Sequence, residues 1–297
     1  MPGKSGRQRP VLFRHRFEYL GFLMLRALLR ALPFRVASNL SSKLWQWIAP
    51  KLHRHVRAQK HLQIAYPEKS AADREAILHA MWGHLGRTMA ESFVIDRIAN
   101  NSAMLEYDFA PGVKSLLDQK RPLIVVGLHL GNWELPAVGA AQYGVELAGL
   151  YQRILNPLVD RAVTGSRSPY YPAGLYTKGH ETVKTLMRLV RQGKSVGIIS
   201  DLRSNRRGLR VKFFGRAAKS SPFPAMLSVM YDAPIVAAQC VRLAPDRFRI
   251  EAVEIKAPDG STRDETIFNR TAAIQAMFEV WIRQHPEQWM WAHRRWD

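Results

Sequence analysis

The chain has 297 residues and one cysteine, Cys240, and it carries 44 Lys and Arg against 24 Asp and Glu, a formal net charge of +20 at pH 7. Hydrophobic residues make up 47% of it, which excludes an intrinsically disordered chain, and the length allows one large α/β domain with an appendage or two small domains, of which one domain is the simpler choice. A lone cysteine excludes internal disulfides and multi-cysteine zinc sites, while the charge favours anionic partners: nucleic acid, an anionic membrane or acidic proteins.

The N-terminal region predicts a membrane-anchoring helix. After a basic stretch, residues 17–34 are mostly apolar, and Arg26 and Arg30, four residues apart, share one helical face. We expect either an interfacial helix or a single span with snorkelling arginines, and an ordinary amphipathic core helix is the alternative. We therefore divide the chain into residues 1–49, the basic N-terminus and anchoring helix, and residues 50–297, the main domain. Ser70 then predicts the cap of a long helix that ends near Ile98.

The central stretch is Leu123–Glu134, with the sequence LIVVGLHLGNWE. Its first half predicts a buried strand, and Gly131-Asn132 predicts a turn, with Asn132 as the N-cap of the following helix. His129 would then lie just beyond the strand's carboxyl end, where open α/β sheets place their ligands.

His129 and Glu134 form a candidate base and its orienting group. On one continuous helix they would point about 140° apart, but a loop before a helix start can bring them together. Glu134 could then accept a hydrogen bond from one imidazole nitrogen and leave the other as a base toward a hydroxyl. The alternative is that His129 only ends a strand and Glu134 only decorates a helix N-terminus.

The later elements predict a single α/β domain with a mostly parallel central sheet flanked by helices. Asp201 follows a predicted strand as His129 does, so the two are expected to face one cleft. We predict strands at Val145–Leu150, Ser195–Ser200 and Ile235–Val241, an edge-like strand at Arg247–Ile255, and helices at His180–Gln192, Ser221–Tyr231 and Asp264–Gln284.

Residues 201–219 form the densest basic patch of the chain, interleaved with the apolar pair Phe213-Phe214. Such runs are usually solvated faces, but arginines also offer planar forks for phosphate or carboxylate oxygens. The candidate substrate-binding residues in this predicted loop are Arg203, Arg206, Arg207 and Arg210.

The HLGNWE motif behind a strand, together with the C-terminal HPEQWMWAHRRW, resembles the lipid A late (secondary) acyltransferases of the H-x-x-x-x-D/E glycerolipid acyltransferase superfamily. Glu134, where glycerolipid enzymes usually carry Asp, points to the lipid A branch. The resemblance implies acyl transfer from a thioester of acyl carrier protein or coenzyme A to a hydroxyl of an anionic lipid A precursor. It also implies membrane lipids as partners, a location at the cytoplasmic side of the bacterial inner membrane, and no metal or cofactor.

The resemblance extends to three further residues. Arg167, in the weakly structured stretch RAVTGSRS, matches an active-site arginine that would stabilise an oxyanion or hold an acceptor phosphate. Asp201 matches an aspartate expected to orient Arg167 or bind a polar group of the acceptor. Arg153 stands one position after the arginine of the family's Tyr-Arg-Pro, and the sequence departs from the family pattern at Gln152 and at Leu202.

Three alternatives remain at this point. A glycerolipid acyltransferase that uses lysophosphatidate is the nearest. A nucleic-acid-binding protein rests on charge alone, and we expect no nucleic-acid partner because no known reading motif is present. A metal-dependent hydrolase at His129 is the third.

Overall fold

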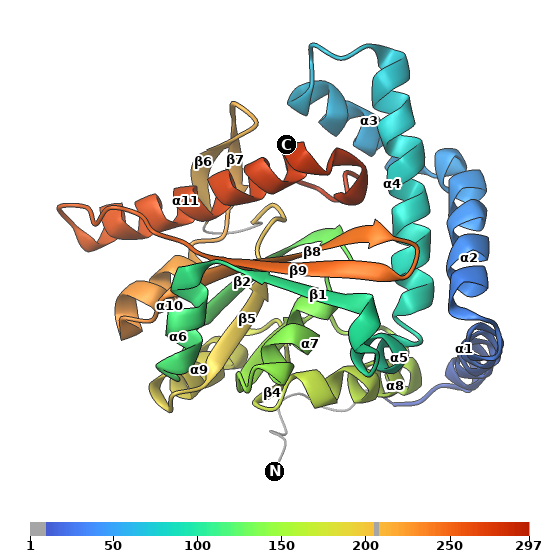
Figure 1. Ribbon diagram of the computed structural model, residues 1–297, viewed down its shortest axis with the longest axis horizontal. Coiled ribbons are helices and arrows are strands. Elements are labelled where there is room, and N and C mark those ends of the chain that lie inside the picture. The colour runs from blue at the N-terminus through green and yellow to red at the C-terminus, as the bar shows by residue number, and fades with distance from the viewer. Residues whose placement is uncertain (1–9, 205–207, 297) are drawn as a thin grey trace.

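The computed structural model describes residues 10–204 and 208–296. A seven-stranded sheet in the order β1-β9-β8-β2-β5-β3-β4 forms its centre, and β6 and β7 make a separate hairpin (Figure 1). The strands are β1 (Leu105–Phe109), β2 (Ile124–Gly131), β3 (Leu147–Tyr151), β4 (Gly174–Thr177), β5 (Ser195–Ile199), β6 (Leu209–Phe213), β7 (Arg216–Ser220), β8 (Ile235–Ala244) and β9 (Arg247–Glu254). The helices are α1 (Phe13–Ala31), α2 (Phe34–Ile48), α3 (His53–Ala65), α4 (Ala71–Glu91), α5 (Ile95–Ala99), α6 (Pro111–Asp118), α7 (Leu135–Gln142), α8 (Pro157–Arg167), α9 (His180–Arg191), α10 (Phe223–Tyr231) and α11 (Arg263–Gln284).

The sheet is covered on both faces. Ile124 and Val126 of β2 join the largest core cluster with Phe278 of α11, whereas Val236 and Ala238 of β8 pack in another cluster that includes α6. Neighbouring strands are parallel except β8 and β9, so the predicted mostly parallel sheet with flanking helices is confirmed.

Two of the predicted elements need correction. The strand β9 is not an edge, because residues 105–109, which we had not predicted as a strand, pair with it in parallel as β1. The long helix predicted to end near Ile98 ends at Glu91, and the short helix α5 follows after a turn. The predicted helices at α9, α10 and α11 are confirmed within about two residues, a normal uncertainty for helix ends.

The bend after β2 differs in detail from the prediction. The strand runs through His129 to Gly131, which pairs with Cys240 of β8, so His129 lies inside the carboxyl end of the strand and not beyond it. The helix α7 begins at Leu135 with Glu134 as its N-cap residue, so the predicted cap at Asn132 is wrong by two positions. The Asn132 side chain instead accepts a hydrogen bond from the Glu134 backbone N–H, at 3.2 Å.

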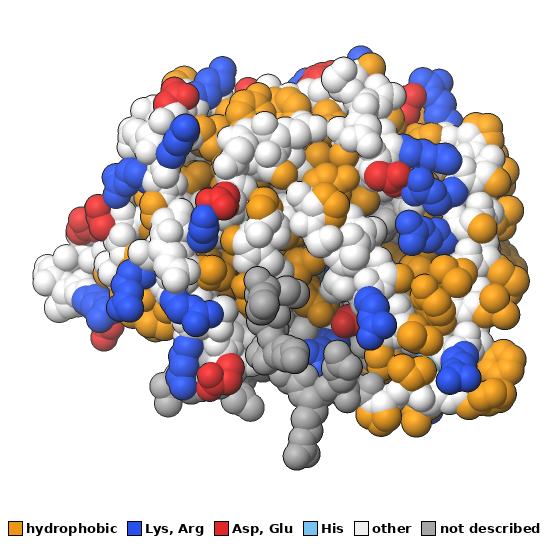
Figure 2. All heavy atoms as spheres, turned by 90° about the horizontal axis from the view of Figure 1, so that it is seen from below, with side chains coloured by type: hydrophobic (Ala, Val, Ile, Leu, Met, Phe, Trp, Pro, Cys, Tyr) orange, Lys and Arg blue, Asp and Glu red, His pale blue; other side chains and the backbone are white. Residues whose placement is uncertain are grey.

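The N-terminal helices α1 and α2 present apolar stripes to the outside. Among the described residues, no helix combines the length and the apolar composition that crossing a bilayer requires. Figure 2 shows hydrophobic side chains gathered together with scattered Lys and Arg over the side of the molecule where α1 lies in Figure 1. The exposed members are Phe13, Phe17, Leu20, Met24 and Leu28 on α1 and Val36, Leu40, Leu44 and Trp47 on α2.

The inner side of α2 packs closely on α4. A Cβ atom at Gly86 would lie 2.5 Å from the Ser41 carbonyl oxygen, so only glycine permits this approach. The Ser41 hydroxyl also donates a hydrogen bond to the Gly86 carbonyl oxygen. Helix α2 therefore belongs to the packed structure around α4, while the division of the chain at residue 49 stays a prediction.

Gly131→Ala is expected to destabilise the protein and abolish its activity. Gly131 has φ +54°, and a Cβ there would lie 1.9 Å from the Cys240 carbonyl oxygen. Gly144→Ala is the matched control, since Gly144 has φ +73° and open space around it. The control substitution should lower the free energy of unfolding only by the backbone strain, about 1 kcal/mol. Thermal unfolding and turnover of both variants test this, and equal stability of the two would contradict it.

Candidate active site

His129 and Asp201 meet where the adjacent strands β2 and β5 end. Nδ1 of His129 lies 2.9 Å from Oδ1 of Asp201, and the His129 backbone N–H donates to Oδ2, also at 2.9 Å. The indole N–H of Trp289 donates to the same Oδ2 at 2.9 Å. The Asp201 side chain is 1% exposed and the His129 side chain 17%. The two residues thus lie in contact, in agreement with the expectation that they face one cleft.

The Asp201 carboxyl is held in its ionised form. Burial alone would raise its pKa, but the charge and hydrogen bonds of His129 and the bond from Trp289 together lower this pKa well below its ordinary value. A permanently ionised partner makes Nδ1 of His129 the protonated nitrogen, so Nε2 keeps its lone pair in the neutral ring.

Glu134 takes a different partner from the predicted one. Its carboxylate pairs with the guanidinium of Arg167, the last residue of α8. Within the described residues Glu134 makes no hydrogen bond to His129, so the predicted contact between these two is wrong. Asp201, which was expected to orient Arg167, contacts His129. The reason is geometric: Glu134 starts α7 on the side of α8, whereas the carboxylate of Asp201 lies beside both the ring and the backbone of His129.

An apolar cavity of about 330 Å³ adjoins the Glu134–Arg167 pair. Such a volume is within the range of small-molecule pockets. Trp133 lies in its wall, and the ring of Trp133 meets His129 edge-on with centroids 5.2 Å apart. The apolar wall is formed by Phe22, Met89, Phe93, Ile95, Trp133, Ile154, Val159, Ala162 and Val163, and the polar part by Arg26, Ser92, Glu134, Ser166 and Arg167.

The C-terminal segment adds two residues that the sequence did not assign. Besides Trp289, His293 lies with its ring centroid 4.6 Å from that of His129. Burial, together with the nearby charge of His129, lowers the pKa of His293 to about 4, so this ring is neutral near pH 7. The signal that pointed here was the motif HPEQWMWAHRRW, to which no separate chemical role had been attached.

The predicted substrate-binding arginines have mixed outcomes. Arg153 is partly buried after β3, and Arg203 lies in the loop that follows β5. Arg210 is exposed on β6, a strand where we had expected a loop. In the described part of the chain, neither Arg153 nor Arg210 forms a hydrogen bond or ion pair with the site residues above, and Arg206 and Arg207 lie outside the described residues. The described side chains contain no group of three His, Cys, Asp or Glu able to hold a metal ion.

His293→Gln is expected to make the protein less sensitive to acid. The pKa of His293 rises from about 4 in the folded protein to its ordinary 6.5 on unfolding. The unfolded chain therefore binds more protons between these values, and the free energy of unfolding falls as the pH falls from 6.5 toward 4. Denaturant unfolding at pH 7 and pH 4.5 should show that the free energy of unfolding falls less between these pH values in the variant than in the wild type. The control is His79→Gln, at an exposed position on α4; an equal loss in both variants would contradict the prediction.

Comparison with known proteins gives one consistent family. A model of the bacterial lipid A biosynthesis acyltransferases matches residues 6–297. The chain is 24% identical over 272 residues to a lipid A biosynthesis palmitoleoyltransferase of Escherichia coli K12, covering 89% of this chain and 86% of the relative. It is 26% identical over 274 residues to the lauroyltransferase of the same organism, with the same coverage. A Haemophilus influenzae lipid A biosynthesis acyltransferase is 27% identical over 184 residues, 59% of this chain and 55% of that protein. The chain therefore belongs to the bacterial lipid A biosynthesis acyltransferase family and is an acyltransferase enzyme.

Proposed function

We propose that this enzyme transfers a fatty acyl chain from an acyl thioester to a hydroxyl of an anionic lipid A precursor, with His129 as the general base. The observation that carries the proposal is the hydrogen bond from Nδ1 of His129 to the buried carboxylate of Asp201. It fixes the ring tautomer in which Nε2 can accept a proton, and His129 remains partly exposed for a substrate to reach.

The chemistry requires no protein nucleophile. Nε2 of His129 takes the proton of the acceptor hydroxyl as its oxygen attacks the thioester carbonyl carbon. The tetrahedral intermediate then breaks its C–S bond, and the imidazolium returns the proton to the departing thiolate. Asp201 stabilises the imidazolium between the two steps, as a buried carboxylate does for a catalytic histidine elsewhere.

Arg167 provides a positive charge next to the apolar cavity. Its pair with Glu134 fixes one side of the guanidinium, and the remaining N–H donors can bind an anionic oxygen of the reactants. That oxygen belongs either to the developing oxyanion or to a phosphate of the acceptor. A fall in kcat for Arg167→Lys indicates the first, and a rise in the KM for the acceptor indicates the second.

The cavity and the net charge support the choice of substrates. A mostly apolar cavity suits an acyl chain, and two relatives are a palmitoleoyltransferase and a lauroyltransferase. A net charge of +20 favours encounter with an acidic acyl carrier protein and with a phosphorylated acceptor. Acyl carrier protein is thus the preferred donor and coenzyme A the alternative.

The apolar stripes on α1 and α2 support attachment to a membrane surface. We propose that these helices lie in the interface of the bacterial inner membrane on its cytoplasmic side, where anionic lipids add about 1 kcal/mol per nearby Lys or Arg. Helix α1 also contributes Phe22 and Arg26 to the cavity wall. The cavity would then open close to the lipids that supply the acceptor.

The reaction is tested by offering acyl carrier protein and coenzyme A thioesters, with a lipid A precursor or lysophosphatidate as acceptor, and identifying the products by mass spectrometry.

His129→Ala should abolish transfer, and Asp201→Asn should lower kcat by roughly 10³-fold because the tautomer is no longer fixed. Glu134→Gln should leave the His129–Asp201 pair intact and lower kcat less than Asp201→Asn does. Full activity of His129→Ala would remove the mechanism, and acylation of lysophosphatidate alone would place the enzyme with the glycerolipid acyltransferases.

Membrane attachment is tested by flotation with vesicles that contain anionic lipids. Phe17→Asp combined with Met24→Asp should lower the bound fraction severalfold, because both side chains are more than half exposed on the α1 stripe. His129→Ala should bind like the wild type and is the control. Unchanged flotation of the double variant would refute interfacial attachment through α1.

A further inference from the structure

We propose that Glu91, at the end of α4, is a positioning residue that acts through Asn132 to fix the bend between His129 and Glu134. The inference rests on the catalytic roles proposed above for the two ends of this bend. No sequence motif pointed to Glu91, which precedes Asn132 by 41 residues.

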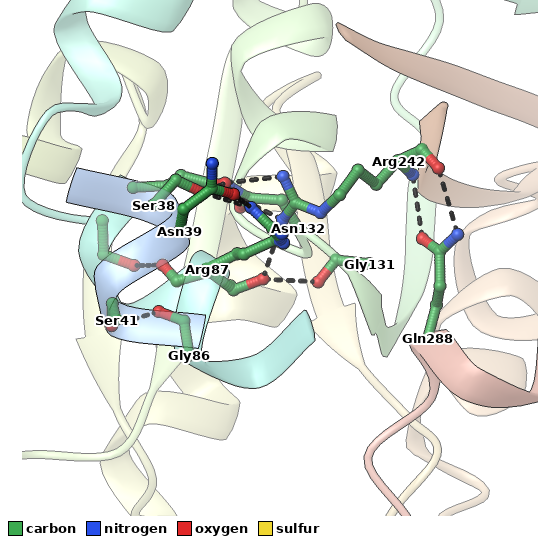
Figure 3. A network of polar contacts seen from close by, with 12 residues as sticks. Ser38, Asn39, Ser41, Gly86, Arg87, Gly131, Asn132, Arg242 and Gln288 are labelled. Carbon is green, nitrogen blue, oxygen red and sulfur yellow. Dashed lines mark hydrogen bonds and ion pairs between the residues drawn. The ribbon is translucent and has the colours of Figure 1, made fainter. Parts of the chain in front are cut away.

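Figure 3 shows a polar network that includes Ser38, Asn132 and Arg242. The carboxylate of Glu91 forms hydrogen bonds with all three of these residues. Its side chain is 1% exposed and forms two hydrogen bonds with the guanidinium of Arg242 on β8, at 2.6 and 2.8 Å. The side-chain amide of Asn132 donates to Oε2 of Glu91 at 2.9 Å, and the Ser38 hydroxyl of α2 donates to Oε1 at 3.3 Å. The ion pair thus connects α4, β8 and the bend, with α2 at its border.

Both residues of the bend are held from α4. Thr88 lies on α4 about one helical turn before Glu91, and its hydroxyl donates a hydrogen bond to the carbonyl oxygen of Gly131 at 3.0 Å. Because Glu91 accepts from the amide nitrogen of Asn132, the amide oxygen is turned toward the backbone N–H of Glu134. The direction of this side chain, and with it the start of α7, is therefore set by a negative charge on Glu91.

The same ion pair reaches the other half of the site. The backbone of Arg242 exchanges two hydrogen bonds with the side-chain amide of Gln288, at 2.9 and 3.1 Å. Gln288 immediately precedes Trp289, which donates to Asp201. The Glu91–Arg242 ion pair is therefore connected by hydrogen bonds both to the Glu134–Arg167 pair and to the His129–Asp201 pair.

Stability alone is a poor explanation for this arrangement. Removing two charges from water costs several kcal/mol per ion, and well-packed apolar residues often stabilise a core as well as a buried ion pair does. What apolar residues cannot provide is a fixed acceptor for the amide of Asn132. Asn132 and Glu91 are thus expected to control turnover more strongly than they control folding.

The test compares kcat and KM for purified variants, normalised to folded protein by circular dichroism. Asn132→Ala keeps the ion pair of Glu91 and Arg242, so it should fold, and it should lower kcat by 10- to 100-fold with the KM for the acyl donor within twofold. Glu91→Gln and Asn132→Asp should each lower kcat similarly, the first by leaving Arg242 without its counter-charge and the second by placing two carboxylates together.

The double variant Glu91→Gln, Asn132→Ala is the decisive measurement. If Glu91 acts through Asn132, replacing Glu91 adds little once the amide of Asn132 is gone, so kcat should lie within threefold of that of Asn132→Ala. Ser38→Ala, which removes a contact with Glu91 away from the bend, is the matched control and should keep wild-type kcat. A wild-type kcat for Asn132→Ala, or a double variant whose kcat falls by the product of the two single losses, overturns the inference. An active His129→Ala enzyme would instead overturn the proposed function.

Discussion

The buried carboxylate of Asp201 is the group on which the arrangement of the site depends. An ionised carboxylate at 1% exposure is tolerable only if donors replace the water it has lost. Three donors do so: the backbone N–H and ring of His129, and the indole of Trp289. The neighbouring strands β2 and β5 and the C-terminal segment must therefore converge on one point, and each contributes to holding the imidazole.

The C-terminal segment closes the carboxyl end of the sheet through aromatic packing. Trp289 and Trp291 are 1% and 0% exposed, and their rings meet edge-on with centroids 4.6 Å apart. Phe213 and Phe214 of the β6–β7 hairpin pack against the same segment. These contacts position Trp289 and His293 beside the imidazole, so both residues belong to the candidate active site.

The site contains two polar pairs at different places. The His129–Asp201 pair lies at the end of the sheet and includes the proposed general base, while the Glu134–Arg167 pair joins the start of α7 to the end of α8 at the wall of the apolar cavity. The bend at Gly131-Asn132 separates them, and the buried network around Glu91 holds it. Because α1 lines the cavity on one side and carries exposed apolar side chains on another, the cavity wall and the proposed membrane face share a helix.

The sequence by itself determined the buried strand that leads to His129, the bend after it, the mostly parallel sheet and the expectation that His129 and Asp201 face one cleft. These follow from hydrophobic periodicity, glycine chemistry and the common edge at which parallel strands end, all of which are local or topological properties. Only the tertiary structure decided the hydrogen-bond partners. Asp201 lies 72 residues from His129, and Arg167 lies 33 residues from Glu134 in a stretch predicted to be weakly structured but folded as α8. Which carboxylate reaches the imidazole depends on a few ångströms of packing between distant elements, and no local pattern in the chain encodes that distance.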